Sequence, residues 1–356
     1  VNFSLAAGTY KDYISIGTIP GSEIWPITFE GVKGNSGAVI LTTSSASGPT
    51  IRLSNVINIH FNYVTVQSLK NESAVAGSGE RLGFNNCSFK GDFTNVWLTN
   101  PKGSLEFSHC TFNSPSGYGF YCTNSKNVIV SDNNFIDCYA YISATNIDSL
   151  TIRNNVVNQT SYSSGKIVAL TQISNLKFIS NRFSSASSYS ITSATPVPVV
   201  ELKNITAGDN LFGNNIITSY SGSSISSNPV NTVSAIDCNV KFYHNTINAN
   251  NKSESSAIYL ENGNNVLKNN IFSSTGSAYC ISAKGPFSQQ QCDYNDFYTT
   301  HQYTAKINAI LCKNLKTWQK VAFSDSNSVS LNPFYALDFH CSEINLKAGA
   351  DIGNIL

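Results

Sequence analysis

The sequence contains no methionine, and only 12% of its 356 residues are charged, about half the roughly 25% found in average proteins. The 22 basic and 21 acidic residues nearly cancel, so no field of one sign would attract nucleic acid or an anionic membrane surface. No apolar run approaches the roughly 18 residues of a membrane span. We therefore expect neither nucleic-acid binding nor membrane insertion.

The nine cysteines form no CxxC pair and show no Cys/His spacing typical of zinc. We expect no metal or cofactor to be held through them. The first ten residues lack the basic start and apolar run of a signal peptide. We interpret the chain as a mature or excised part of a longer polypeptide, and the absence of methionine would suit an oxidising exterior.

In place of charged residues, the sequence is rich in uncharged polar residues and in aromatic residues. The chain has 44 Asn, and its 20 Phe and 17 Tyr supply too much apolar surface for a disordered chain. Ten segments, 22 to 35 residues apart, repeat one pattern: apolar, polar, apolar, two polar, a reference residue, any residue, and an apolar residue. The reference residues are Asn62, Cys87, Cys110, Asn133, Asn155, Asn181, Asn210, Asn245, Asn270 and Asn295. The apolar residues two positions later are Val64, Phe89, Phe112, Phe135, Val157, Phe183, Phe212, Ile247, Phe272 and Phe297.

Strand-like alternation with this period predicts an all-β, single-stranded parallel β-helix of about ten to eleven coils. Equivalent residues then stack about 4.8 Å apart, so the asparagines should form a hydrogen-bonded ladder beside a column of stacked Phe rings. Near Asn210, the sequence GNNII offers Asn215 as a competing reference. Cys87 and Cys110 replace Asn on consecutive coils, where a disulfide and two buried thiols both fit.

The two ends break the repeat, as expected for a solenoid that must cover its open coils. We expect the β-helix to span residues 1–300, with an entry coil and cap at 1–50, and a closing segment to span 301–356. A short helix is predicted around Lys313 to Lys320.

The ends also carry a family resemblance. The segments LAAGTYKDYISI, WQKVAFSDSNSVSLNPFY and DFHCSEINLKAGADIG resemble the opening and closing parts of right-handed parallel β-helix modules in large secreted proteins of Bacteroidetes. The motifs YHNTI, KNNIF and DYNDFY fit the same family, so the resemblance spans nearly the whole chain, although SEINLKAG replaces the usual SPAIDAG ending. The resemblance implies a right-handed coil, export by type IX secretion, a secreted or cell-surface location and an adhesin-like role.

An enzyme of this fold would need a catalytic cluster. Glu106, Asp132, Arg153 and Lys177 are predicted to form an outward strip over successive coils, about 15 Å long. Under a polysaccharide lyase hypothesis, Arg153 and Lys177 would act as base or neutralise a uronate, and Glu106 with Asp132 would bind calcium. Ordinary solvated surface residues are the simpler interpretation of this strip.

Aromatic residues favour a binding function instead. Tyr118, Tyr121, Tyr139 and Tyr141 lie on two neighbouring predicted coils, where exposed rings could stack on sugars while Asn, Ser and Thr bind hydroxyls. Strand alternation equally allows two of the four to point inward. The sequence therefore favours a non-catalytic adhesion or glycan-recognition module, with a polysaccharide lyase or glycoside hydrolase and a structural spacer as the alternatives.

Overall fold

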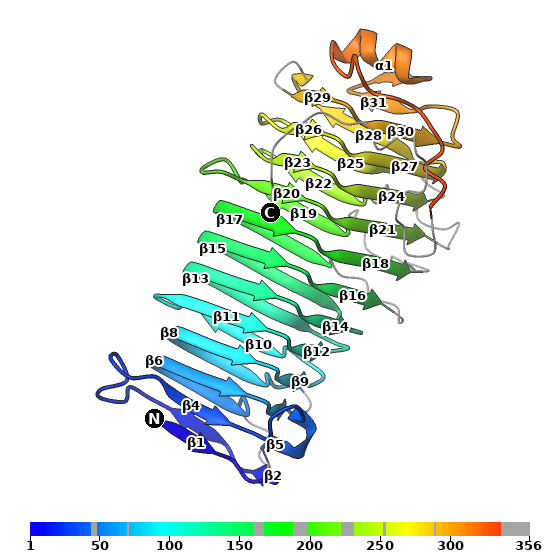
Figure 1. Cartoon of the computed structure of the whole chain (residues 1–356). Helices are drawn as coiled ribbons and strands as arrows, with labels where there is room; N and C mark the ends of the chain where they lie inside the picture. Colours follow the sequence, from blue (N-terminus) through cyan, green and yellow to red (C-terminus); the bar gives the residue numbers. More distant parts are fainter. Residues whose placement is uncertain are drawn as a thin grey trace. The chain divides into compact units, whose positions relative to one another are not determined.

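The chain folds as a parallel β-helix, as the repeat predicts. The computed structural model describes residues 1–43, 48–69, 71–159, 167–187, 198–221, 231–251, 254–287 and 290–335, and the solenoid has about eleven turns. It divides into two compact units, Val1–Ala169 and Leu170–Leu356. Within each unit, successive coils place equivalent strands side by side in two parallel sheets (Figure 1).

In the part of the chain that the structure describes, the first unit contributes nine strands to the larger sheet and seven to the smaller sheet. The larger sheet contains β1 (Asn2–Ser4), β3 (Ile14–Ile16), β4 (Ile27–Glu30), β6 (Ile51–Asn62), β8 (Val75–Asn85), β10 (Val96–Thr99), β11 (Ser104–Ser108), β13 (Tyr118–Ser131) and β15 (Ala140–Arg153). The smaller sheet contains β2 (Gly8–Lys11), β5 (Val39–Thr42), β7 (Thr65–Gln67), β9 (Ser88–Lys90), β12 (Thr111–Asn113), β14 (Asn134–Ile136) and β16 (Val156–Gln159). A 3-10 turn, η1 (Ser36–Ala38), precedes β5.

The second unit repeats this plan, except that its last described strand pairs antiparallel with the strand before it and is followed by a helix. Its larger sheet contains β17 (Val168–Ile179, which begins at the unit boundary), β19 (Val200–Lys203), β20 (Leu211–Gly213), β22 (Val233–Ile236), β23 (Lys241–Tyr243), β25 (Ser256–Glu261), β26 (Val266–Lys268), β28 (Tyr279–Lys284), β29 (Gln291–Asp293), β31 (Ala305–Ile307) and β32 (Ile310–Cys312). Its smaller sheet contains β18 (Arg182–Ser187), β21 (Ile216–Ser221), β24 (Thr246–Asn251), β27 (Ile271–Gly276) and β30 (Asp296–Thr299). The helix α1 spans Leu315–Ala322.

The core consists of columns of side chains from equivalent positions. In the first unit, Phe29, Phe61, Phe84 and Phe107 stack in sequence with ring centroids 4.9, 5.2 and 5.0 Å apart. The smaller sheet adds a second column, in which Phe112 and Phe135 are 4.6 Å apart. Apart from the half-buried Phe29, these rings are buried. Fully burying a phenylalanine ring contributes about 1.5–3 kcal/mol, so these columns are a large part of what holds the coils together.

Asparagine ladders run beside these columns. In the first unit, Asn133 donates its side-chain amide to Oδ1 of Asn155 at 3.0 Å. In the second unit, the same bond links Asn245 to Asn270 at 2.9 Å and Asn270 to Asn295 at 3.0 Å. Each of these side chains is buried, and its neighbour on the next coil supplies the partner that a buried amide requires.

The predicted register is wrong at Asn62. Asn62 pairs with Asn85 rather than with Cys87, and its amide donates to Glu30 at 2.7 Å. The residue at the ladder position of that coil is Val64, which is fully buried. The prediction placed the ladder residue two positions too early. Because side chains two residues apart on a strand point to the same face, the alternation of apolar and polar residues could not reveal the error.

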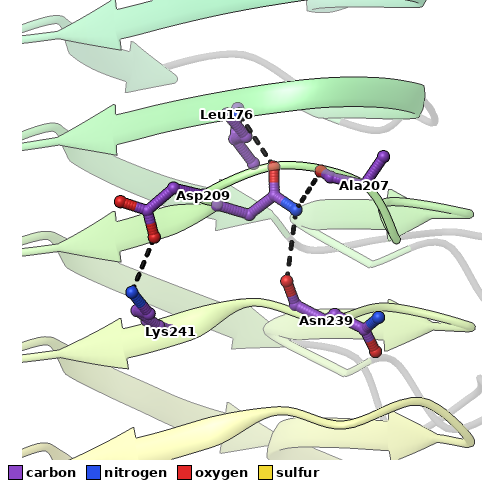
Figure 2. A network of polar contacts seen from close by, with 6 residues as sticks. Leu176, Ala207, Asp209, Asn239 and Lys241 are labelled. Carbon is purple, nitrogen blue, oxygen red and sulfur yellow. Dashed lines mark hydrogen bonds and ion pairs between the residues drawn. The ribbon is translucent and has the colours of Figure 1, made fainter.

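The predicted register is also wrong near Asn210, where the ladder residue lies five positions further along the chain. Asn215, the competing reference, occupies the main ladder and donates to Asn245 at 2.9 Å. Asn210 instead accepts a bond from the backbone N–H of Leu176 and donates to the carbonyl groups of Ala207 and Asn239, at a different corner of the coil (Figure 2). Phe212 accordingly stacks on Phe178, at 4.6 Å, rather than in the column of Phe183.

Cys87 and Cys110 occupy the ladder as free, buried thiols, and no bridge joins them. Cys110 keeps part of the ladder because its backbone N–H donates to Oδ1 of Asn133 at 2.8 Å. Burial raises the pKa of the Cys110 thiol well above its usual value. These cysteines therefore act as small apolar core residues.

The two ends of the chain are finished differently. Residues 1–50 form more than one coil, because β1 pairs with β4 and β3 pairs with β6, and Phe3 remains 49% exposed. At the other end, Asp325 extends the ladder by accepting from Asn295 at 3.0 Å and from the indole of Trp318 at 2.8 Å. Trp318 lies on α1, which starts two residues later than expected, and is fully buried. Residues 336–356, including the motif SEINLKAG, lie outside the described part of the chain.

Candidate functional site

The four residues of the predicted strip do not share one column. Glu106 is exposed on β11, and its column runs through Gly83 to His60. Burial lowers the pKa of His60, and the nearby charge of Glu106 partly opposes that shift. Glu106 therefore shares a column with His60, with Gly83 between them. The sequence alone did not suggest this neighbour.

The other strip residues stand at different positions of their coils. Arg153 is exposed in the column of Ser131. Asp132 sits in a left-handed turn with φ 59° and accepts a bond from Asn154 at 3.0 Å. Lys177 is exposed on β17 in the second unit, opposite Leu211. Within the first unit, the strip is thus spread over three columns, and the described residues contain no cluster of three or more His, Cys, Asp or Glu side chains that could hold a metal ion.

The four tyrosines divide between surface and core. Tyr141 is 0% exposed and packs edge-on against Phe135 at 6.3 Å, so its expected place on the binding surface is wrong. Tyr139 is exposed in the connection before β15. Tyr118 and Tyr121 lie half-buried on the outer face of β13, with ring centroids 5.4 Å apart.

Trp97 completes this cluster, and the sequence analysis missed it. Its strand β10 pairs with β13 so that Trp97 lies opposite Tyr121, and the two rings stack at 4.2 Å with an interplanar angle of 19°. We call Trp97, Tyr121 and Tyr118 the aromatic row. Trp97 could have been found from the alternation of β10, because the flanking Val96 and Leu98 are core residues and the residue between them must face outward.

Small side chains flank the aromatic row. On the strand before β10, the residue opposite Trp97 is Ala76, and on the strand after β13, the residue opposite Tyr121 is Ser143. Because the two rings stack across adjacent strands, the remaining face of Trp97 is directed toward the coil of Ala76. A methyl group leaves that side of the indole uncovered by its column neighbour, so the row offers a ring face as well as ring edges.

Two rows of hydrogen-bonding groups run beside the aromatic row. Thr99, Thr123 and Thr145 lie opposite one another on β10, β13 and β15, two residues further along the same outer face. Next to them, Asn124 links the exposed turn amides by accepting from Asn146 at 2.7 Å and donating to Asn100 at 2.6 Å. The surface thus combines aromatic rings with uncharged donors and acceptors repeated about every 4.8 Å.

Comparison with known proteins supports the fold. A family model described as "Right handed beta helix region" matches residues 37–202, which agrees with the predicted handedness. No curated protein matches the sequence. Among the described residues, no helix is long and apolar enough to cross a membrane.

Several solved structures are similar at low scores. The A-module of the mannuronan C-5 epimerase AlgE6 from Azotobacter vinelandii has a TM-score of 0.36 and 11% identity, over 94% of this chain and 91% of that one. The catalytic domain of a GH87 α-1,3-glucanase in complex with nigerose has a TM-score of 0.32 and 9% identity, over 93% and 63%. The tailspike of E. coli bacteriophage HK620 has a TM-score of 0.27 and 10% identity, over 92% and 74%. Scores of this size do not assign an activity to this chain.

Proposed function

We propose that this chain is a glycan-recognition module and that the aromatic row is its binding surface. The observation that carries the proposal is the stack of Trp97 on Tyr121, half-buried on the outer face of the first unit. Aromatic rings offer large, rigid contact area to the apolar faces of a ligand, and a few placed polar groups fix its orientation. A sugar needs both kinds of contact.

The polar rows suit a carbohydrate better than a protein or nucleic-acid partner. The hydroxyls of Thr99, Thr123 and Thr145 and the amides of the neighbouring asparagine turns both donate and accept hydrogen bonds, as sugar hydroxyls do. The chain as a whole carries a formal net charge of +1, so long-range attraction to phosphate would be weak. Recognition at the row would depend on stacking and on short-range hydrogen bonds.

We further propose that the module acts outside the cell, as an adhesive part of a longer secreted or surface protein of the Bacteroidetes type. The support is the resemblance of LAAGTYKDYISI and the closing segments to such modules, together with the uncharged polar surface. Fractionation of the native host, with detection of this chain in the medium or at the cell surface, tests the location. Recovery solely from the cytoplasm would refute it.

Binding to an array of neutral and acidic glycans tests the proposed function. Trp97→Ala should weaken the strongest interaction about tenfold, since one aromatic stacking contact contributes roughly 0.5–1.5 kcal/mol beyond area burial. Trp25→Ala is the matched control, because Trp25 is 68% exposed and lies outside the row. Equal affinities of the two variants would refute the role of the row. New reducing ends or unsaturated products would indicate an enzyme, and no binding to any glycan would indicate a spacer.

A further inference from the structure

A second outer surface, in the unit Leu170–Leu356, forms a hollow that the sequence analysis did not predict. It has a volume of about 230 Å³ and lies over β25, β28 and β31. Its walls include Glu254, Tyr259, Tyr279, Lys284 and Lys306. Such a volume is below the roughly 300–1,000 Å³ of pockets that hold drug-sized ligands, so it would take one ring-sized unit.

The hollow arises from one small residue between two large ones. In strand register, Tyr259 of β25 lies opposite Ser282 of β28, which lies opposite Lys306 of β31. Tyr259 and Lys306 are therefore two coils, or about 9.6 Å, apart, and the serine between them does not fill the space. Tyr279, at the start of β28, forms an apolar wall and is 3% exposed.

The acceptor atoms of Glu261, next to the hollow, are already used. Its Oε1 accepts from Lys284 at 2.7 Å and its Oε2 accepts from the hydroxyl of Tyr259 at 2.8 Å. The bond from Lys284 holds the pKa of Glu261 below its usual value, and burial together with the bond to Glu261 raises the pKa of Tyr259. Glu261 therefore stays charged and Tyr259 stays protonated at neutral pH.

The lysines, in contrast, keep donors for a ligand. An ammonium group has three N–H donors, and Lys284 uses one of them on Glu261 while its side chain is 66% exposed. Lys306 contacts Glu254 at 3.2 Å and lies 5.9 Å from the ring centroid of Tyr279. Because Glu254 is itself largely exposed, a ligand carboxylate could replace it at Lys306 at little cost.

The positions of the two lysines suit a single anionic group. Lys306 lies opposite Ser282, and Lys284 is two residues beyond Ser282 on the same strand. On parallel strands, residues one strand apart and two positions along are about 8 Å apart at the backbone, within reach of two long side chains converging on one carboxylate. The tyrosine rings would face the rest of the ligand.

We propose that this hollow binds the uronate unit of an acidic glycan, with the carboxylate on Lys284 and Lys306 and the sugar ring against Tyr259 and Tyr279. The inference rests on the proposed function, since it takes the ligand to be a glycan. It adds a second site with its own chemistry, because the aromatic row of the first unit carries no paired lysines. An acidic peptide would satisfy the lysines equally but gains less from two rigid ring walls.

Calorimetric titration of the full chain carrying Trp97→Ala tests the hollow without the aromatic row. The probes are tetragalacturonate, its methyl ester and a tetraglutamate peptide. We expect tetragalacturonate to bind at least about tenfold more tightly than the methyl ester, the difference expected for one charge-assisted hydrogen bond. Adding Lys284→Gln should remove that preference.

Lys241→Gln is the matched control. Lys241 forms the same kind of exposed ion pair, with Asp209 at 2.6 Å, on β23 of the same unit and outside the hollow (Figure 2). Equal binding of acid and ester, equal effects of the two lysine variants, or tighter binding of tetraglutamate would each overturn the inference. If the Trp97→Ala protein fails to bind tetragalacturonate while the wild type binds a glycan through Trp97, the inference fails and the proposed function stands.

Discussion

Asp296 provides a sharp test of how the closing segment covers the last coils. Its side chain is 2% exposed, and Oδ1 accepts from the backbone N–H of Leu331 at 2.8 Å. Within the described residues, Oδ2 is buried and has no hydrogen-bond partner. The segment containing Val329 and Leu331 causes this burial, because it pairs beside Asp296 where another coil would otherwise follow. Burial raises the pKa of Asp296 to about 7.

The expected effect on stability follows from this pKa. Between the usual value of 3.8 and about 7, the folded chain keeps a proton on Asp296 that the unfolded chain releases. The free energy of unfolding must then fall as the pH rises through this range and level off above about 7. At about 1.4 kcal/mol per pH unit, the loss between pH 5 and pH 8 is about 3 kcal/mol.

Asp296→Asn removes this titration and keeps the acceptor for Leu331. The variant's free energy of unfolding, minus that of the wild type, should rise by about 3 kcal/mol from pH 5 to pH 8, whatever fixed penalty the new amide adds. Urea unfolding at pH 5, 6, 7 and 8 measures this difference. Fluorescence reports on the buried Trp318 near the closing segment and circular dichroism reports on the sheets, which checks whether the solenoid unfolds in one step.

Asp237→Asn is the control for this experiment. Asp237 is exposed and accepts a bond from Asn262 at 2.9 Å, so its substitution removes the same charge without relieving burial. Its effect on stability should change by less than about 0.5 kcal/mol over the same pH range. If the stability curves of the wild type and Asp296→Asn run parallel, the carboxyl is not held protonated and the reasoning is refuted.

Two further predictions concern the core. Asn245→Ala should lower the free energy of unfolding by at least about 3 kcal/mol in urea titrations, because it leaves the buried N–H of Asn215 and the carbonyl of Phe212 without their partners. The control Asn262→Ala, at an exposed turn, should lower it by about 1 kcal/mol. Equal losses in the two variants would contradict a stabilising ladder. Cys122, whose pKa burial raises to about 12, should resist iodoacetamide at pH 8 and react only after unfolding, as peptide mass spectrometry would show; rapid labelling of the native chain would contradict the fold at β13.

The stacking of equivalent residues could be predicted from the sequence because it follows from a repeat. Phe112 and Phe135 recur at the spacing of one coil, and a parallel β-helix brings residues at that spacing together. The prediction was less accurate where the local pattern admits a second register. At Asn62 the second register places the apolar Val64 in the ladder, and near Asn210 it places Asn215 there; both sites fit the local alternation, so the pairing of the neighbouring coils decides between the registers.

The candidate sites depend on features that no single repeat contains. Trp97 and Tyr121 are 24 residues apart and become stacked rings through the pairing of β10 with β13. Tyr141 and Tyr139 have similar sequence surroundings, yet one is buried and the other exposed, because the start of β15 sets which side chain faces inward. The hollow near Lys284 exists because Ser282 falls between Tyr259 and Lys306 in the register.

The periodic pattern of Asn and Phe was therefore enough to establish the solenoid, since the coil repeat converts spacing along the chain directly into contact. Outward-facing residues are not constrained by that repeat. Which of them meet is decided by the pairing of coils of different length, from 22 residues between Asn133 and Asn155 to 34 between Asn181 and Asn215. The described strands stay in register across coils of different length, so the surface columns, and with them the proposed binding sites, follow from the tertiary structure.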